Sequence, residues 1–401
     1  MLRRLPLLSL SLFALPLAAQ APAEDAALRH ARALLADRPI FDGHNDLPWE
    51  IRVNPQSKMD VSKYDIRGRA PGHTDLPRLR AGGVGAQFWS VYVPGEIKDS
   101  GYARVQLEEI DIARQVIARY PDALGLALSA DDVVKIRKSG RVASLLGMEG
   151  GHAIENSLGA LRMYYALGVR YMTLTHNVTL DWADAATGLP THGGLTDFGR
   201  DVVREMNRIG MIVDLSHVAP STMSNVLDVA TAPVIFSHSS ARAILDHPRN
   251  VPDSILARLP KNGGVVMITF VGSFISPTIR AWEQMQRDST GSIADRETRR
   301  VAVEGFLRRH PKPQATVAEL ANHIEHARKI AGIAHVGLGS DYDGTSELPV
   351  GMEDVSGFPQ LFAELIRRGW TDADLKKLAG ENVLRVLREA ERVRDRSAAA
   401  R

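Results

Sequence analysis

Short apolar runs alternate with longer amphipathic segments along most of the chain. The apolar runs predict eight β-strands, at Pro39–Asp46, Gly85–Val93, Val142–Glu149, Val169–Thr175, Met211–Ser216, Pro233–Ser237, Gly264–Thr269 and His335–Gly339. The segments between them show helical periodicity, at Tyr102–Tyr120, Leu158–Leu167, Thr196–Ile209, Ser221–Val229 and Thr316–Ala331. Strands that are apolar throughout are typical of a parallel sheet with helices outside it.

Eight strand-and-helix units favour an α/β fold, a closed (β/α)₈ barrel of the TIM type. An open doubly wound sheet is the main alternative. Two closing helices, expected at Phe358–Arg368 and Thr371–Arg392, would pack on the outside of the barrel. Two connections, Asn54–Gly83 and Phe270–Pro313, are longer than ordinary loops, which predicts lids or walls of a binding site, and the second is expected to contain several helical turns.

The first residues have the order of a secretory signal peptide. Two arginines precede the apolar run Leu5–Ala19, and small residues follow it. The run is too short to span a bilayer comfortably, and a frayed hydrophobic terminus is the weaker alternative. We therefore expect a signal peptide at residues 1–21 and one domain at residues 22–401. No later segment predicts a membrane span, and we expect an exported protein of the bacterial periplasm.

Composition narrows the chemistry that this chain can carry. Its 401 residues are 44% hydrophobic and 24% charged, which predicts a folded globular protein. With 49 basic and 47 acidic residues and no polybasic block, nucleic acid is not expected as a partner. The chain has no cysteine, so disulfides, thiolate metal sites and thiol nucleophiles are excluded, but thirteen histidines remain.

The strongest local signal lies at the end of the first predicted strand, in the sequence Phe41-Asp42-Gly43-His44-Asn45-Asp46. Side chains two apart on a strand point the same way, so His44 and Asp46 project together. An imidazole and a carboxylate that share one direction can bind a divalent metal ion. Taken alone, this pair is a weak signal.

Further candidates follow other predicted strands, namely Glu149, His176, His217, His238, Asp341 and Asp343. In a parallel barrel all carboxyl ends open on the same face, where active sites lie. Each histidine taken singly is more often structural, but their joint placement predicts a metal centre at this face. Asp214, inside a strand, is expected to support the ligands rather than to bind metal.

Three other histidines are not expected to bind metal at this centre. His323 and His326 lie on a predicted helix without an acidic partner pattern, which favours a solvated helix face. His152 follows two glycines that predict a tight turn. It is either a further site residue or merely a support for Glu149, and the sequence leaves both open. Asp341-x-Asp343 does not continue into the spacing of an EF-hand calcium loop.

These residues resemble the membrane (renal-type) dipeptidases, peptidase family M19, a branch of the metal-dependent amidohydrolase superfamily. The resemblance runs from about Pro39 to Arg392, and its markers begin at Asp42, Glu149, Thr173, Ser237 and Arg249 as Asp-Gly-His-Asn-Asp-Leu-Pro-Trp, Glu-Gly-Gly-His, Thr-Leu-Thr-His, Ser-His-Ser-Ser and Arg-Asn-Val-Pro. It implies a zinc-dependent dipeptidase with two Zn²⁺ per chain, and a homodimer.

The resemblance also implies roles for individual residues. His44 and Asp46 would bind one zinc ion, His217 and His238 the other, and Glu149 would bridge them. A hydroxide between the ions would attack the peptide carbonyl, with Asp341 as its proton acceptor. His176 would stabilise the oxyanion and contact substrate, and Arg249 would pair with the substrate carboxylate. From the sequence alone, a surface position for Arg249 is the alternative.

Other functions remain open at this point. A dipeptide substrate, including one with a C-terminal D-residue, is the leading expectation. A binuclear metal amidohydrolase acting on another amide, such as an N-acyl amino acid or a β-lactam, is the nearest alternative. A non-catalytic binding protein is disfavoured because the set of candidate ligands and the candidate base Asp341 are intact.

Overall fold

The computed structural model describes residues 25–97 and 101–399, so the signal peptide predicted at residues 1–21 lies outside the described residues. Its centre is a parallel sheet with strands β1 (Ile40–Asn45), β2 (Val84–Tyr92), β3 (Leu124–Leu126), β4 (Val142–Glu149), β5 (Val169–Thr173), β6 (Ile212–Asp214), β7 (Ile235–Phe236), β8 (Val265–Ile268) and β9 (Val336–Leu338). β2 pairs with both β1 and β4, and β9 pairs with β1, which closes eight of the strands into a barrel. The predicted (β/α)₈ architecture is confirmed.

β3 is the strand that the sequence pattern did not predict. It has three residues and pairs with Val142, Ala143 and Ser144 at the amino end of β4. On the same side of β4, β5 pairs further along the strand, from Leu146 onward. β3 therefore extends the sheet at the amino end of β4 and is not one of the eight strands that close the barrel.

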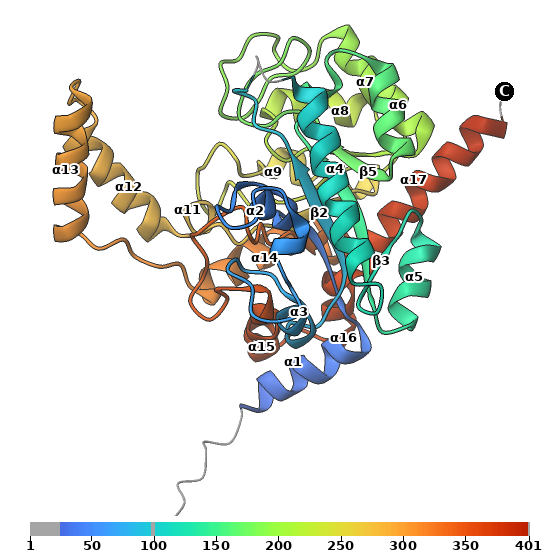
Figure 1. The fold of residues 1–401 in the computed structure, drawn as a ribbon, viewed down its shortest axis with the longest axis horizontal. Coiled ribbons are helices and arrows are strands. Elements are labelled where there is room, and N and C mark those ends of the chain that lie inside the picture. Colours follow the sequence, from blue (N-terminus) through green and yellow to red (C-terminus); the bar gives the residue numbers. More distant parts are fainter. Residues whose placement is uncertain (1–24, 98–100, 400–401) are drawn as a thin grey trace, which may run out of the picture.

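Helices surround the barrel on its outer face (Figure 1). In chain order they are α1 (Ala26–Asp37), α2 (Leu47–Val53), α3 (Leu76–Ala81), α4 (Tyr102–Arg119), α5 (Ala130–Lys138), α6 (Leu158–Ala166), α7 (Asp197–Ile209), α8 (Pro220–Val229), α9 (Asp253–Leu256), α10 (Leu259–Asn262), α11 (Gly272–Ile275), α12 (Pro277–Thr290), α13 (Arg296–Arg309), α14 (Val317–Ala331), α15 (Phe358–Arg367), α16 (Asp372–Lys376) and α17 (Asn382–Ala399). Short helical turns are η1 (Val61–Lys63), η3 (Gly151–Ile154), η4 (Ile333–His335) and η5 (Val355–Gly357). Within the described residues, no helix has the length and apolar character that crossing a membrane requires.

The interior of the barrel is filled by large side chains. Phe41, Phe88, Tyr171 and Met267 form one fully buried cluster, and α17 adds its own residues, Val383, Val386, Leu387 and Ala390, to the same cluster. Burying such side chains removes their apolar surface from water, which is the main favourable contribution to folding. α17 thus closes one end of the barrel and leaves the other end for chemistry.

The second predicted closing helix is not continuous. Thr371 caps α16 by accepting a hydrogen bond from the backbone N–H of Asp374, and the helix is then interrupted at η6 (Lys377–Glu381) before α17 begins. Gly380 lies within this interruption, where an added Cβ atom would come within 2.7 Å of Cβ of Phe41. The close approach to β1 therefore requires glycine at this position, where the backbone leaves the helical conformation (φ 169°, ψ −8°).

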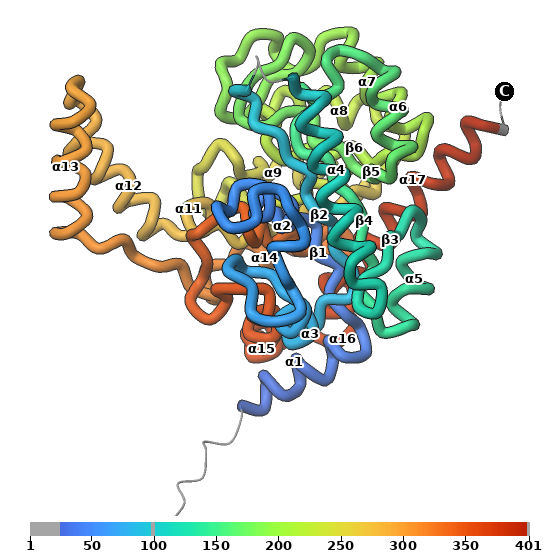
Figure 2. The backbone as a smooth tube through the Cα atoms, in the orientation of Figure 1, coloured from blue at the N-terminus to red at the C-terminus, as the bar shows by residue number. Residues whose placement is uncertain are grey.

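The two long connections have different structures. Residues 54–83 contain η1 and α3 and lie beside the barrel mouth, where the backbone N–H of His73 donates to Asp343. Residues 270–313, in which helical turns were expected, hold α11, α12 and α13. α12 and α13 form a helical arm that projects away from the barrel (Figure 2), with Trp282 packed edge-on against Phe306 inside it. Only the start of this connection reaches the mouth.

Candidate metal centre

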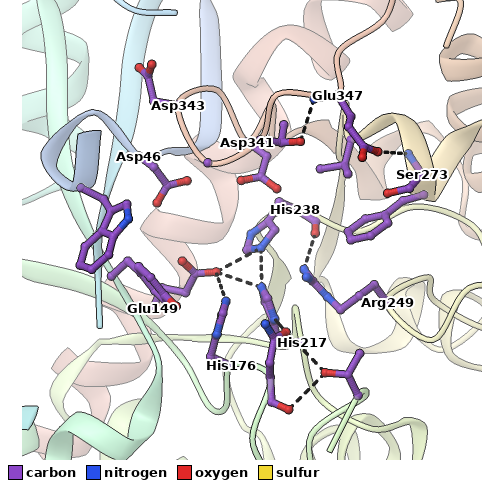
Figure 3. Close-up of a pocket in the computed structure, with 18 of the residues that line it drawn as sticks. Asp46, Glu149, His176, His217, His238, Arg249, Ser273, Asp341, Asp343 and Glu347 are labelled. Carbon is purple, nitrogen blue, oxygen red and sulfur yellow. Dashed lines mark hydrogen bonds and ion pairs between the residues drawn. The ribbon is translucent and has the colours of Figure 1, made fainter. Parts of the chain in front are cut away.

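The carboxyl ends of the strands surround a cavity of about 580 Å³. All the sequence-predicted site residues except His44 line it directly, namely Asp46, Glu149, His176, His217, His238, Arg249 and Asp341 (Figure 3). His44 lies fully buried just behind this surface, with its ring 3.9 Å from that of His238. The residues come from segments up to about 300 positions apart, and the closure of the barrel brings them together.

Glu149 lies at the centre of this group, at the end of β4. Its Oε1 atom is 2.9 Å from Nε2 of His217 and 3.3 Å from Nε2 of His238. Its Oε2 atom is 3.4 Å from Nε2 of His44, which in turn lies 3.3 Å from Oδ2 of Asp46. The two carboxylate oxygens therefore face two different groups of candidate ligands.

The donor atoms fit a metal centre. Three groups have ligand atoms that all lie within 4.8 Å of one another: His44, Glu149 and His238; Glu149, His176 and His217; and His44, Asp46 and Asp341. Nε2 of His44 is buried and has no well-aligned hydrogen-bond partner. A buried nitrogen without a partner is costly unless something binds it. Imidazole nitrogens and carboxylate oxygens are the donor types that zinc and related divalent ions take.

The backbone is strained at three positions around this centre. His217, Asp341 and Asp343 have φ angles of 67°, 67° and 66°, in the left-handed region that residues with a Cβ rarely adopt. The backbone N–H of Asp341 donates to the carbonyl of His44, and the backbone N–H of Asp343 donates to Nδ1 of His73. Gly344 follows at once, where an added Cβ would come within 2.3 Å of Oδ2 of Asp46. These turns aim the side chains into the cavity.

The surroundings shift the pKa values of the two central carboxylates, Glu149 and Asp341, in opposite directions. Burial opposes ionisation of Glu149, but the surrounding imidazoles of His44, His217 and His238 outweigh it and hold its pKa well below the usual range. Burial raises the pKa of Asp341 well above its ordinary value, and the neighbouring charges of Asp46 and Glu149 act in the same direction. Of the two, Asp341 is therefore the carboxylate suited to take up a proton.

His176 and Arg249 lie on either side of the histidine cluster. His176 packs against Tyr92 with ring centroids 4.7 Å apart, and its Nε2 atom lies 4.0 Å from Oε1 of Glu149. Arg249 is only 6% exposed, so the alternative of a surface arginine is wrong. One of its NH₂ groups donates to the carbonyl of His238 at 3.3 Å, and its guanidinium lies 5.1 Å from the centre of the Phe274 ring.

Arg249 remains a cation in this setting. Burial lowers the pKa of Arg249 to about 10, which still leaves it protonated at neutral pH. Its Nε–H has no partner in the protein although the atom is buried. A fixed, partly unsatisfied guanidinium at the wall of a cavity is suited to bind a carboxylate.

Several structural residues at the mouth were not found from the sequence. Trp49, Tyr92, His247 and Phe274 line the cavity, and His247 stacks on Phe274 with ring centroids 4.4 Å apart. Tyr92 ends β2, so the rule that strand ends face the mouth could have found it. Phe274 lies in the long connection that the sequence predicted to wall the site, in α11, but nothing in the sequence singles out Phe274 or His247.

The helical histidines differ from their prediction. His323 is fully buried, not solvated, because its Nδ1 accepts from the backbone N–H of Ala241 and its Nε2 contacts the carbonyl of Ile275. His326 is partly buried and pairs with Asp253 at 2.7 Å. His152 contacts the carbonyl of Val93 at 2.8 Å, so it supports the end of β2 beside Glu149.

Comparison with known proteins agrees with this geometry. The sequence model of the family described as "Membrane dipeptidase (Peptidase family M19)" matches residues 28–401. The chain belongs to the membrane dipeptidase family. A curated member, Dipeptidase 3 of Rattus norvegicus, is 41% identical over 373 residues, which cover 92% of this chain and 68% of that protein. The resemblance that the motifs indicated is therefore confirmed.

Solved structures show the same fold. The probable dipeptidase PvdM from Pseudomonas aeruginosa aligns with a TM-score of 0.79 and 25% identity, covering 92% of this chain and 99% of that one. A metallo peptidase from Rhodobacter sphaeroides, solved with a phosphinate mimic of the dipeptide L-Ala-D-Ala, aligns with a TM-score of 0.71 and 26% identity, covering 88% and 99%. As a member of the membrane dipeptidase family with an intact group of ligands, this protein is a metallo-dipeptidase.

Proposed function

We propose that this protein hydrolyses the peptide bond of dipeptides at a centre of two zinc ions. The observation that carries the proposal is the position of Glu149, whose two oxygens face His44 on one side and His217 with His238 on the other. A carboxylate in that position can be shared by two cations. His44 and Asp46 would complete one ion's ligands, and His217 and His238 the other's.

The reaction needs few groups beyond these ligands. Two bound zinc ions would polarise the carbonyl and lower the pKa of an attacking water. The partly buried Asp341 carboxylate would orient that water, take its proton and deliver the proton to the leaving amine nitrogen. Its raised pKa supports this role, because a carboxyl that holds a proton readily can also pass it on. Nε2 of His176 would donate to the developing oxyanion.

Arg249 would fix the register of the substrate. Its buried guanidinium lies against Phe274 at the cavity wall and would pair with the terminal carboxylate of a short peptide. A cavity of about 580 Å³, much of it taken by the metal centre, suits a substrate of dipeptide size. Longer peptides have their carboxylate too far from the first peptide bond to satisfy both contacts.

The Rhodobacter sphaeroides relative, solved with a mimic of L-Ala-D-Ala, supports acceptance of a D-residue at the C-terminal position. Export to a periplasm rests on the signal-like order of residues 1–21, and assembly as a homodimer rests on likeness to the family. N-terminal sequencing of the secreted chain and sedimentation of the purified protein test these two points.

One assay tests the proposed activity. The purified protein is given L,L- and L,D-dipeptides, N-acyl amino acids and a carbapenem, each with and without chelator, after its zinc content has been measured. We expect chelator-sensitive hydrolysis of dipeptides and close to two zinc ions per chain. Preference for N-acyl amino acids or the carbapenem would support the alternative amidohydrolase activity. Dipeptide hydrolysis that survives complete metal removal would refute the mechanism.

A further inference from the structure

The ring nitrogens that face away from the cavity are held by hydroxyl groups in two of the candidate ligands. Nδ1 of His44 lies 2.9 Å from the hydroxyl of Tyr171, and Nδ1 of His238 lies 2.8 Å from Oγ of Ser237. Both hydroxyls are fully buried. A hydroxyl has one proton to donate, so its other hydrogen bonds decide whether it donates to the imidazole or accepts from it.

Proton counting settles the direction at His44. The hydroxyl of Tyr171 donates to the carbonyl of Gly43 at 3.2 Å. Its single proton is then used, so it accepts a hydrogen bond from Nδ1–H of His44. The neutral ring carries its proton on Nδ1, and Nε2 keeps a lone pair directed at Asp46 and Glu149.

The direction of the hydrogen bond at His238 follows from the same count of protons, along a series of hydrogen bonds from His238 through Ser237 to Asp214. The hydroxyl of Ser237 donates to Oδ2 of Asp214 at 2.6 Å, a charged acceptor that is preferred over a neutral ring nitrogen. Ser237 therefore accepts from Nδ1–H of His238. Oδ1 of Asp214 is occupied separately, by the backbone N–H groups of Ser216 and Ser237 at 3.1 and 2.8 Å, so the carboxylate cannot rotate.

From this accounting we infer that Tyr171 and Ser237, the latter oriented by Asp214, are positioning residues that each fix the metal-binding tautomer of one histidine. Tyr171 serves the ion at His44 and Asp46, and Ser237 serves the ion at His217 and His238. The inference rests on the two-ion centre of the proposed function. Partners of this kind typically change metal affinity about 10- to 100-fold when removed.

Replacing Asp214 by asparagine makes the sharpest distinction. The two backbone N–H donors fix the amide oxygen at the Oδ1 position, which places the amide NH₂ opposite the hydroxyls of Ser237 and Thr173. Ser237 would then accept from the amide, and its own proton would turn toward Nδ1 of His238 at 2.8 Å, a nearer acceptor than Oγ of Ser216 at 3.4 Å. Nε2 of His238 would carry the ring proton and lose its lone pair, although the side chain keeps its size.

The experiment follows stepwise binding of Co²⁺ by visible spectroscopy in the metal-depleted full-length protein and in the variants Tyr171→Phe, Ser237→Ala and Asp214→Asn. In the Co²⁺ protein, exchangeable Nδ1–H protons of bound histidines give shifted NMR signals that vanish in D₂O. We expect such signals in the parent protein. Tyr171→Phe should weaken one ion about 10- to 100-fold, and Ser237→Ala and Asp214→Asn should both weaken the other.

The controls separate the possible failures. Tyr164→Phe removes a buried hydroxyl that donates to the carbonyl of Ala153, away from the ligands, and should change neither ion. If the parent protein binds fewer than two Co²⁺ ions, the proposed function itself fails. If the parent binds two and the three variants bind both as tightly, or each variant weakens both ions equally, the positioning roles are refuted. Ser237→Ala carries the test alone should Asp214→Asn not fold.

Discussion

The Nε2 atoms of His217 and His238 lie 2.9 Å apart, although the residues follow two different strands, β6 and β7. At this distance the two nitrogens either share one proton in an N–H···N hydrogen bond or both direct lone pairs at a common cation. Both nitrogens also face Oε1 of Glu149, at 2.9 and 3.3 Å. A cation among the three atoms would satisfy both lone pairs and the carboxylate together. The spacing and the shared carboxylate therefore fit a ligand set.

Removal of metal should therefore destabilise the fold. Without cations, the lone pairs and carboxylates at the mouth repel one another in a buried environment. Zinc at a free concentration of about 100 times its Kd should raise the free energy of unfolding by about 3 kcal/mol per site. Calorimetry of the chelator-treated protein, with and without added zinc, measures this as a rise in Tm. Equal Tm values in the two samples, after metal removal has been verified, would count against the centre.

The substitution Glu149→Gln should weaken both ions. It replaces the shared carboxylate by a neutral amide, and removing one partner of a buried set of charges costs about 3–5 kcal/mol. Asp46→Asn is the matched control, because Asp46 lies near His44 and away from the other histidine pair, and it should weaken one ion only. Metal content measured after dialysis distinguishes the two variants. Retention of both ions by Glu149→Gln would show that it does not bridge them.

The barrel could be predicted from the sequence because its strands are apolar throughout and alternate with amphipathic helices. β3 escaped prediction because three residues give too little pattern. Helical turns were expected within residues 270–313, but the bounds of α12 and α13 and their projection from the barrel were not, because most side chains of this arm are solvated.

The site could be predicted to the extent that it follows the strand ends. Glu149 ends β4 and His217 and His238 follow β6 and β7, so the topology alone brings them together. His323 was misjudged because its partners, Ala241 and Ile275, come from distant connections whose backbone reaches the helix only in the folded chain. Sequence periodicity carries no information about such contacts.

The substitution Asp341→Asn should leave both ions bound and abolish most turnover. An amide of the same shape cannot accept the proton of the attacking water, and general base catalysis typically contributes about 100- to 10,000-fold. We expect kcat to fall within that range while KM changes little. Metal analysis of the same sample shows whether the loss is chemical. Turnover at the parent rate would remove Asp341 from the role of proton carrier.

The substitution Arg249→Ala should raise KM for dipeptides with a free carboxylate. A hydrogen bond to a charged group contributes about 1.5–3 kcal/mol, which corresponds to about 10- to 100-fold in KM. An amidated dipeptide, which lacks the carboxylate, should react with Arg249→Ala and with the parent at similar kcat/KM. Arg249→Lys keeps the charge but loses the two-pronged contact, so its KM for the free-carboxylate dipeptide should lie between those of the parent and Arg249→Ala. Equal losses for the acid and the amide would assign Arg249 a structural role.

The buried His323 should contribute to the loss of stability in acid. Burial lowers the pKa of His323 to about 4, from an ordinary value of 6.5. Between these values the unfolded chain binds a proton that the folded chain does not, so the free energy of unfolding falls as the pH drops from about 6.5 to about 4. The full effect of this one group is about 3 kcal/mol.

The substitution His323→Gln isolates that contribution, because a glutamine can accept from the N–H of Ala241 and donate to the carbonyl of Ile275 but does not titrate. Urea unfolding of both proteins in chelator, at several pH values from 7 to 4, keeps metal loss out of the comparison. We expect the variant to lose less stability than the parent over this range, by up to about 3 kcal/mol. Parallel pH profiles would mean that His323 becomes protonated without unfolding, and that the backbone of Ala241 can give up its hydrogen bond at little cost.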